Sequence, residues 1–294
     1  MNTLKWTIGE VTIYNIVELE AGPLIQSIIK NATQEAIQSI DWLYPHFADE
    51  SGNLKAAVQS FLIKSDGKNI LIDGCNGNGK LRTDIPEWSN LRTDFLAKLG
   101  RLGMALSDID IVACTHLHCD HVGWNTKLEN GIWEPTFPKA QYLFAQEEYE
   151  YWKKKPEKEI ADDKAAFDDS VSPIVKAGLA KLVKPDYIID RNMSLFPTPG
   201  HTPCHVSVLV ESLGQHAIIS GDFLHHPCQI AYPRWTTNAD TLPDKGIETR
   251  IDVLRRIERS DAVLIGSHFA HPVAGKVISI GDGFAFRTVE QHED

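Results

Sequence analysis

Residues 113–125 read ACTHLHCDHVGWN and place three histidines, an aspartate and a cysteine within six positions. These side chains are typical metal ligands and follow directly on an apolar run: His116, His118, Cys119, Asp120 and His121. A folding core has no use for so many adjacent polar groups, because each would have to be paired inside the protein. The stretch therefore predicts a metal site.

The spacing of this motif fits two ions better than one. Side chains two positions apart in an extended segment point the same way, so His116 and His118 can bind one ion. Where the chain turns, the adjacent Asp120 and His121 diverge and can reach a second ion. Zinc accepts imidazole nitrogen and carboxylate oxygen at about 2.0–2.2 Å, and one short segment cannot complete two such sites.

Three further candidates each lie at the end of an apolar run: His201 in FPTPGHTPCH, Asp222 in AIISGDF and His268 in AVLIGSHF. Polar residues at the ends of buried strands would converge at one edge of a sheet. We assign the first ion to His116, His118 and His201, and the second to Asp120, His121 and His268. Asp222 would bridge both ions, because a carboxylate offers two oxygens.

Other polar residues near these positions have alternative interpretations. Cys119 should point away from the ions and fill a small buried space. His205 is a weak alternative to His201, and His271 to His268. Asp73 in LIDG either holds the far nitrogen of a ligand imidazole or serves the turn before Gly74.

The elements that must position these residues are short strands alternating with helices. Strands are expected in residues 5–18, in two runs of 56–80 joined at SDGKN, and in residues 109–115, 140–145, 186–190, 193–200, 205–212, 216–222 and 261–268. Helices are expected in residues 33–40, in 89–104 with Ser89 as the N-cap, and in 146–159, 164–182 and 242–260. We interpret residues 1–294 as a single α/β domain with sheets inside and helices outside. Residues 20–55 form an N-terminal extension.

The candidate ligands match, in their order along the chain, those of a known family. The chain resembles the metallo-β-lactamase superfamily of hydrolases, and within it the N-acyl-homoserine-lactone lactonase-like branch. The likeness runs from LIDGCNG to His268. It implies an αββα four-layer sandwich with the metals at one edge of the two sheets. The chain departs from the best-known lactonases at GDFLHHP, where His225 stands in place of a tyrosine three residues after the bridging aspartate.

Two divalent ions, zinc or else iron, manganese or cobalt, imply hydrolysis of a C=O or P=O centre. A metal-bridging hydroxide would attack a lactone or carboxylic ester, with Asp120 orienting it. His225 would donate a hydrogen bond or a proton, although a structural role fits it equally well. Phosphotriester hydrolysis on the same site is the alternative.

Thiolester hydrolysis of the glyoxalase II type is less favoured, because only 26 residues follow His268. A non-enzymatic metal-binding role is the remaining class. Trp124, Phe223, Trp42 and Trp235 are candidates for an apolar substrate pocket.

Composition and charge limit the partners of the chain. The formal net charge is −11 with no basic block, which argues against a nucleic-acid partner. We find no apolar stretch of the length of a membrane span and no leader, and the five scattered cysteines are typical of reduced thiols in a cytoplasmic protein. By analogy with lactonase-like relatives, the 20–55 extension predicts a homodimer and a narrowed pocket.

Overall fold

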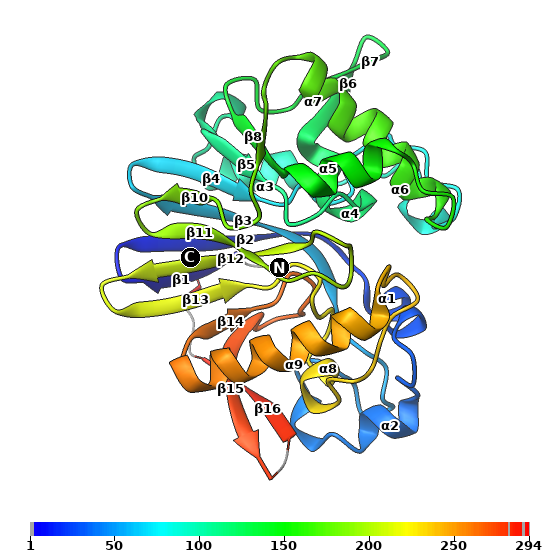
Figure 1. The fold of residues 1–294 in the computed structure, drawn as a ribbon, viewed down its shortest axis with the longest axis vertical. Helices are drawn as coiled ribbons and strands as arrows, with labels where there is room; N and C mark the ends of the chain where they lie inside the picture. The colour runs from blue at the N-terminus through cyan, green and yellow to red at the C-terminus, as the bar shows by residue number, and fades with distance from the viewer. Residues whose placement is uncertain (1–2, 282, 290–291, 294) are drawn as a thin grey trace.

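The computed structural model describes residues 3–281, 283–289 and 292–293. Its centre is formed by two large sheets (Figure 1). The first has eight strands in the order β17-β1-β2-β3-β4-β5-β8-β9. Its strands are β1 (Leu4–Ile8), β2 (Val11–Glu20), β3 (Ala57–Ser65), β4 (Lys68–Ile72), β5 (Ile111–Ala113), β8 (Gln141–Ala145), β9 (Ala180–Val183) and β17 (His292–Glu293).

The second sheet has seven strands in the order β10-β11-β12-β13-β14-β15-β16. Its strands are β10 (Ile188–Asp190), β11 (Met193–Pro197), β12 (Val206–Ser212), β13 (Gln215–Ile219), β14 (Val263–Ile265), β15 (Ala274–Ile280) and β16 (Gly283–Thr288). A separate hairpin pairs β6 (Thr126–Glu129) with β7 (Ile132–Pro135). Both large sheets are mixed, because β4, β5, β8 and β9 run parallel in the first, and β13 and β14 in the second.

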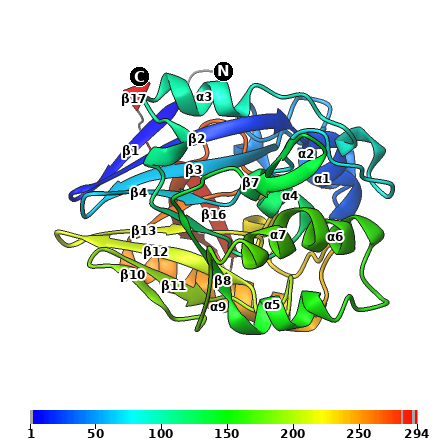
Figure 2. The ribbon, with the colours of Figure 1, turned by 90° about the horizontal axis from the view of Figure 1, so that it is seen from above.

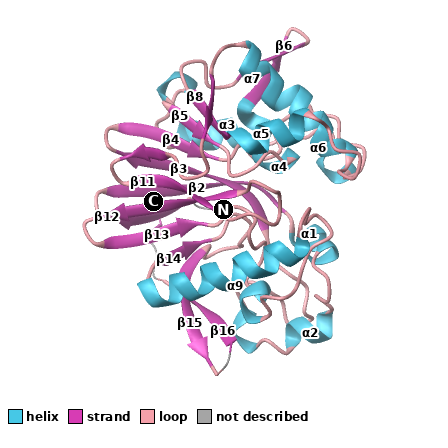
Figure 3. Ribbon diagram, viewed as in Figure 1, coloured by secondary structure: helices cyan, strands magenta, loops and turns pink. Residues whose placement is uncertain are grey.

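Helices lie on the outer sides of the two sheets and at one end of their strands (Figures 2 and 3). They are α1 (Gly22–Ile28), α2 (Gln34–Gln38), α3 (Phe95–Arg101), α4 (Cys119–Val122), α5 (Gln146–Lys153), α6 (Ala161–Ala166), α7 (Ser172–Lys176), α8 (Cys228–Ala231) and α9 (Pro243–Ser260). A π-helical turn (Phe167–Val171) joins α6 to α7. Helix α3 packs on β2 and α5 on β8, whereas α9 packs on β15 and α8 on β16. The result is the expected four-layer αββα arrangement.

Two apolar cores account for this layering. Ile13, Ile63 and Val208 belong to the core between the sheets, while Ile16 and Leu62 belong to the core beneath the helices. Neighbouring residues of one strand thus enter different cores, because successive side chains of a strand point to opposite faces. Strands covered on both faces are apolar along most of their length.

Several local expectations were wrong. Ser89 does not cap a helix, since α3 begins only at Phe95. Residues 180–183, expected at the end of a helix, form strand β9 because they pair with β8. The strands β6, β7, β15, β16 and β17 were not predicted. Tertiary pairing overrides local pattern in such segments.

The extension of residues 20–55 packs on its own chain. The Phe47 ring lies 5.9 Å from Phe269 and 5.7 Å from Phe286, centre to centre. The Lys30 amide donates to the Thr236 carbonyl at 2.8 Å. The homodimer stays a prediction. Among the described helices, none combines the length and apolar character that a membrane span requires.

Candidate metal centre

The seven candidate ligands lie on four segments that meet at one end of the two sheets. The chain leaves β5 into the segment 116–121, β13 leads to Asp222, β14 leads to His268, and His201 lies between β11 and β12. Backbone hydrogen bonds hold these ends together: the Val206 amide donates to Thr115, and the Ala57 amide to His268.

Two glycines permit the close approach of these segments. Gly200 has φ +144°, and a Cβ there would lie 2.3 Å from the Gly246 Cα. Gly221 has φ +54°, and a Cβ there would lie 2.5 Å from the His205 Nε2. A side chain at either position would therefore displace a ligand segment.

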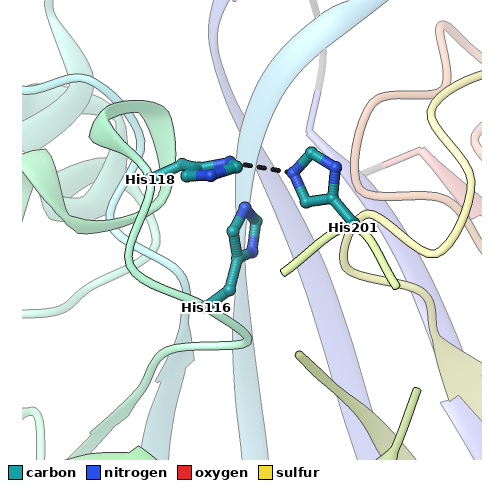
Figure 4. Close-up of side chains that lie close together, drawn as sticks. All are labelled: His116, His118 and His201. Carbon is teal, nitrogen blue, oxygen red and sulfur yellow. Dashed lines mark hydrogen bonds between the residues drawn. The ribbon is translucent and has the colours of Figure 1, made fainter. Parts of the chain in front are cut away.

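The candidate ligand atoms fall into four groups of three, each with all atoms within 4.8 Å of one another. The groups are His116–His118–His201, His116–His121–Asp222, Asp120–His121–His268 and His201–Asp222–His225. Figure 4 shows the first group, in which three imidazoles from two segments converge. The His118 Nδ1 and His201 Nε2 are 2.8 Å apart.

Asp222 lies between the two predicted ligand sets. Its Oδ1 is 3.3 Å from the His121 Nε2, while its Oδ2 is 3.5 Å from the His201 Nε2 and 3.2 Å from the His268 Nε2. One carboxylate thus faces imidazoles of both groups, as a bridging ligand requires.

For four of the five candidate imidazoles, the ring nitrogen that faces away from the cluster has a hydrogen-bonding partner in the protein; the exception is His118. The His121 Nδ1 is 2.9 Å from the Asp73 Oδ2, so Asp73 holds the imidazole of a candidate ligand. Asp73 also accepts from the Thr115 hydroxyl, whose oxygen is 3.0 Å from the His116 Nδ1. The His268 Nδ1 is 2.9 Å from the Ala57 carbonyl oxygen. Such contacts fix the orientation and tautomer of metal-binding histidines.

Three buried carboxylates at the site were not singled out from the sequence. Asp240 Oδ1 is 3.1 Å from the His201 Nδ1, and Asp163 Oδ2 is 3.9 Å from the His118 Nε2. Glu148 accepts hydrogen bonds from the Leu117 amide and the Thr202 hydroxyl, and so joins two ligand segments. Their sequence contexts, a charged helix and polar loops, carry no signal of this placement.

The structure separates the alternative candidates. His225 lies in the cluster, with its Nε2 3.2 Å from the Asp222 Oδ2. His226 instead contacts the Phe47 carbonyl and the Cys228 amide. His205 accepts from the Asp222 amide and contacts Thr198, so both of its nitrogens have structural partners.

Cys119 and His271 belong to none of the four groups. Cys119 is buried, as a filler should be. His271 lines a cavity of about 620 Å³ beside the His268 segment, which none of the seven candidate ligands lines.

The aromatic residues expected to line a substrate pocket do not line this cavity either. Trp124 is held in the core, where its Nε1 donates to Glu18 at 2.6 Å and its ring stacks on Phe95. Phe223 is buried. A place in a substrate pocket stays a prediction for these aromatic residues.

Burial and neighbouring charges shift the imidazole pKa values in opposite directions in the two predicted ligand sets. Burial holds the pKa of His116 well below its usual range and, with His118, lowers the pKa of His201 to about 4. Both rings are thus neutral at pH 7, the form that binds metals. Burial would raise the pKa of Asp240, but the hydrogen bond to His201 holds it well below its ordinary value.

In the second group, by contrast, the imidazole pKa values are raised. Burial disfavours the charged forms of His121 and His268, but Asp222 outweighs it at both and raises their pKa values. Burial would raise the pKa of Asp222, but His268 and His121 hold it well below its usual range. A metal ion must displace these protons when it binds.

The donor set fits divalent ions. His116 Nε2 and Asp222 Oδ1 face the cluster, are buried and have no hydrogen-bond partner among the described residues. Buried polar atoms without partners are costly, and nitrogen and carboxylate oxygen suit zinc and its neighbours in the first transition row.

Comparison with known protein families shows to which family the chain belongs. The profile of the metallo-beta-lactamase superfamily matches residues 55–268, which contain all the candidate ligands. The chain belongs to the metallo-beta-lactamase superfamily.

Within the superfamily, the curated relatives are distant lactonases. An N-acyl homoserine lactonase of a Bacillus species is 30% identical over 115 residues, which are 39% of this chain and 38% of that protein. The chain matches less than half the length of the curated relatives.

Solved superfamily structures share the whole fold. The dizinc quorum-quenching lactonase AidC, solved with the product N-hexanoyl-L-homoserine, has a TM-score of 0.79 at 20% identity, covering 98% of both chains. The hydrolase AbOPH has a TM-score of 0.82 at 21% identity, covering 100% of this chain and 99% of that one. These likenesses confirm the predicted fold.

Proposed function

We propose that this chain is a dinuclear metal-dependent hydrolase that opens lactones or cleaves carboxylic esters. The observation that carries the proposal is the position of Asp222, whose two oxygens face imidazoles of both predicted ligand sets. The ions would be held by the sets assigned from the sequence, namely His116, His118 and His201 for the first and Asp120, His121 and His268 for the second. The similarity to lactonases supports the ester class.

When bound, two divalent ions activate a water molecule near neutral pH and polarise the substrate oxygen. The residues of the chain would orient the attacking water and the substrate. Asp120 is more exposed than the imidazoles around it, so substrate would approach from its side. There its carboxylate can orient the attacking water.

His225 would donate a proton to the leaving group. Its Nε2 faces Asp222, and its Nδ1 is buried without a hydrogen-bond partner among the described residues. Metal-binding histidines are normally held through the second ring nitrogen, as His121 and His268 are here. A proton donor needs a ring nitrogen that the protein does not already engage, and the Nδ1 of His225 is such an atom among the described residues.

A substrate panel tests the proposal. Zinc-loaded protein should open N-acyl-homoserine lactones or simple γ- and δ-lactones, or cleave aryl esters. Asp222→Ala should abolish activity and remove one equivalent of metal, as measured by elemental analysis after dialysis. Asp190→Asn is the matched control, because Asp190 is a buried carboxylate outside the cluster that contacts the Asn192 amide.

Three outcomes would contradict the proposal. If the protein cleaved phosphotriesters but no lactone or ester, it would be a phosphotriester hydrolase and not a lactonase or esterase. A protein that binds two ions but hydrolyses no member of the panel would remove the enzymatic function. Full activity in Asp222→Ala would refute the bridging role.

A further inference from the structure

The two ligand groups differ in the charge that they offer directly to an ion. The second group contains the carboxylate of Asp120 besides two imidazoles. The first consists of three imidazoles, His116, His118 and His201, and shares only the bridging Asp222. An ion bound by neutral ligands in a buried site needs compensating charge nearby, because burial of an uncompensated charge is costly.

Asp163, on α6, lies behind one imidazole of the first group. Its side chain is buried, and its Oδ1 accepts a hydrogen bond from the Cys119 amide at 2.9 Å. Its Oδ2 is 3.9 Å from the Nε2 of His118, which has no hydrogen-bond partner among the described residues. The opposite nitrogen of His118, Nδ1, is the one that faces the group.

Asp240 lies behind His201, closer to its imidazole than Asp163 is to that of His118. Its Oδ1 is 3.1 Å from the His201 Nδ1, while the Thr237 amide donates to its Oδ2 at 2.8 Å. The segment that carries it is fixed to the ligand loop, since the Thr241 amide donates to the His201 carbonyl at 2.8 Å. These contacts hold the Asp240 carboxylate against the His201 imidazole.

We propose that Asp163 and Asp240 are positioning residues that supply, through His118 and His201, the negative charge that the first ion lacks among its direct ligands. This inference rests on the proposed dinuclear function and deepens it. Each carboxylate orients one imidazole and makes it a stronger donor when an ion binds. The second group needs less of this support, because Asp120 contributes its charge directly.

Zinc titration against a chromogenic chelator tests the proposal without any substrate. Asp163→Asn and Asp240→Asn each keep the shape of the side chain but remove its charge. Each should weaken binding of one of the two zinc equivalents by about 10- to 100-fold and leave the other unchanged. The d–d absorption of the cobalt-substituted protein should change for the same equivalent.

The neighbouring Asp162 provides a matched control. It is also a buried aspartate of α6, but its carboxylate accepts hydrogen bonds from the amides of Thr83, Asp84 and Ile85. Asp162→Asn should lower thermal stability and leave both zinc affinities unchanged. A general loosening of the fold would instead change metal binding in Asp162→Asn as well.

The affected ion is assigned by removing one ligand group at a time. In a chain carrying Asp120→Asn, which weakens the second group, Asp163→Asn should still reduce the affinity of the remaining ion. In a chain carrying His116→Ala, which weakens the first group, it should have no further effect. Unchanged zinc affinities in both aspartate variants, or equal losses in the two backgrounds, would overturn the proposal. A wild-type chain that binds no zinc would overturn the proposed function as well.

Discussion

At the scale of single residues, two adjacent histidines have different surroundings. His225 faces Asp222 in the cluster and has an unpartnered Nδ1 within the described part of the chain. His226 is held through both ring nitrogens by the backbone of Phe47 and Cys228. The pair therefore offers a test of proton donation against structural support within one short segment.

If His225 donates a proton to the leaving group, His225→Ala should lower kcat for lactones about 100-fold, because alkoxides leave poorly without a proton. Aryl esters, whose phenolate leaves readily, should lose much less. The metal content should stay at two equivalents. His226→Gln is the control and should affect stability more than turnover. Equal losses on both substrates would contradict proton donation, and loss of one metal equivalent would indicate a ligand instead.

The sequence could predict the candidate ligands because their identities and spacing are themselves the signal. His116, His118, Asp120 and His121 lie within six positions, and the remaining three follow apolar runs. The carboxylates behind them could not be predicted. Asp163 and Asp240 reach the imidazoles through tertiary packing, and nothing in the residues next to either of them shows which side chain it will contact.

At the scale of elements, the loop after β4 is anchored to the π-helical turn by a buried ion cluster. Lys80 donates to Thr126 and pairs with Asp169 at 3.2 Å, and its ammonium lies 3.7 Å from the centre of the Trp133 ring. Arg82 also pairs with Asp169, at 2.8 Å. Burial outweighs these partners and lowers the pKa of Lys80 to about 8.

This shift predicts a pH dependence of stability. Between pH 8 and about 10.5, the unfolded chain binds a proton at Lys80 that the folded chain has lost, so stability should rise with pH there. The slope is at most about 1.4 kcal/mol per pH unit. Urea denaturation at several pH values should show this rise relative to Lys80→Met, which removes the group. Lys68→Met, at a more exposed position, should behave like the wild type. Parallel curves for the wild type and Lys80→Met would contradict the shift.

Boundaries of elements were the weakest part of the sequence-based prediction. Residues 164–182 have the composition of one helix, but the structure divides them into α6, a π-helical turn, α7 and strand β9. The partner of β9 is β8, which lies more than 30 positions earlier. Such pairing is decided by the sheet and not by the local pattern, so the alternation of strands and helices predicted the fold class better than its borders.

At the scale of the whole molecule, the candidate metal centre joins the two sheets. The segment 116–121 follows β5 of the eight-stranded sheet, whereas His201, Asp222 and His268 follow strands of the seven-stranded sheet. Ions bound there would link the two halves of the fold. They would also offset negative charge in a chain whose net charge is −11, because buried carboxylates surround the cluster.

Removal of metal should therefore destabilise the entire protein and not just the site. An ion present at 1,000 times its dissociation constant stabilises the folded state by about 4 kcal/mol, which corresponds to a rise in Tm of about 10 °C for a chain of this size. Calorimetry with zinc and with a chelator should show this difference, and added zinc should restore the higher Tm. Asp222→Ala should reduce the difference, because it lacks the carboxylate that faces both groups. An unchanged Tm after measured loss of both ions would show that the sheets hold together without them.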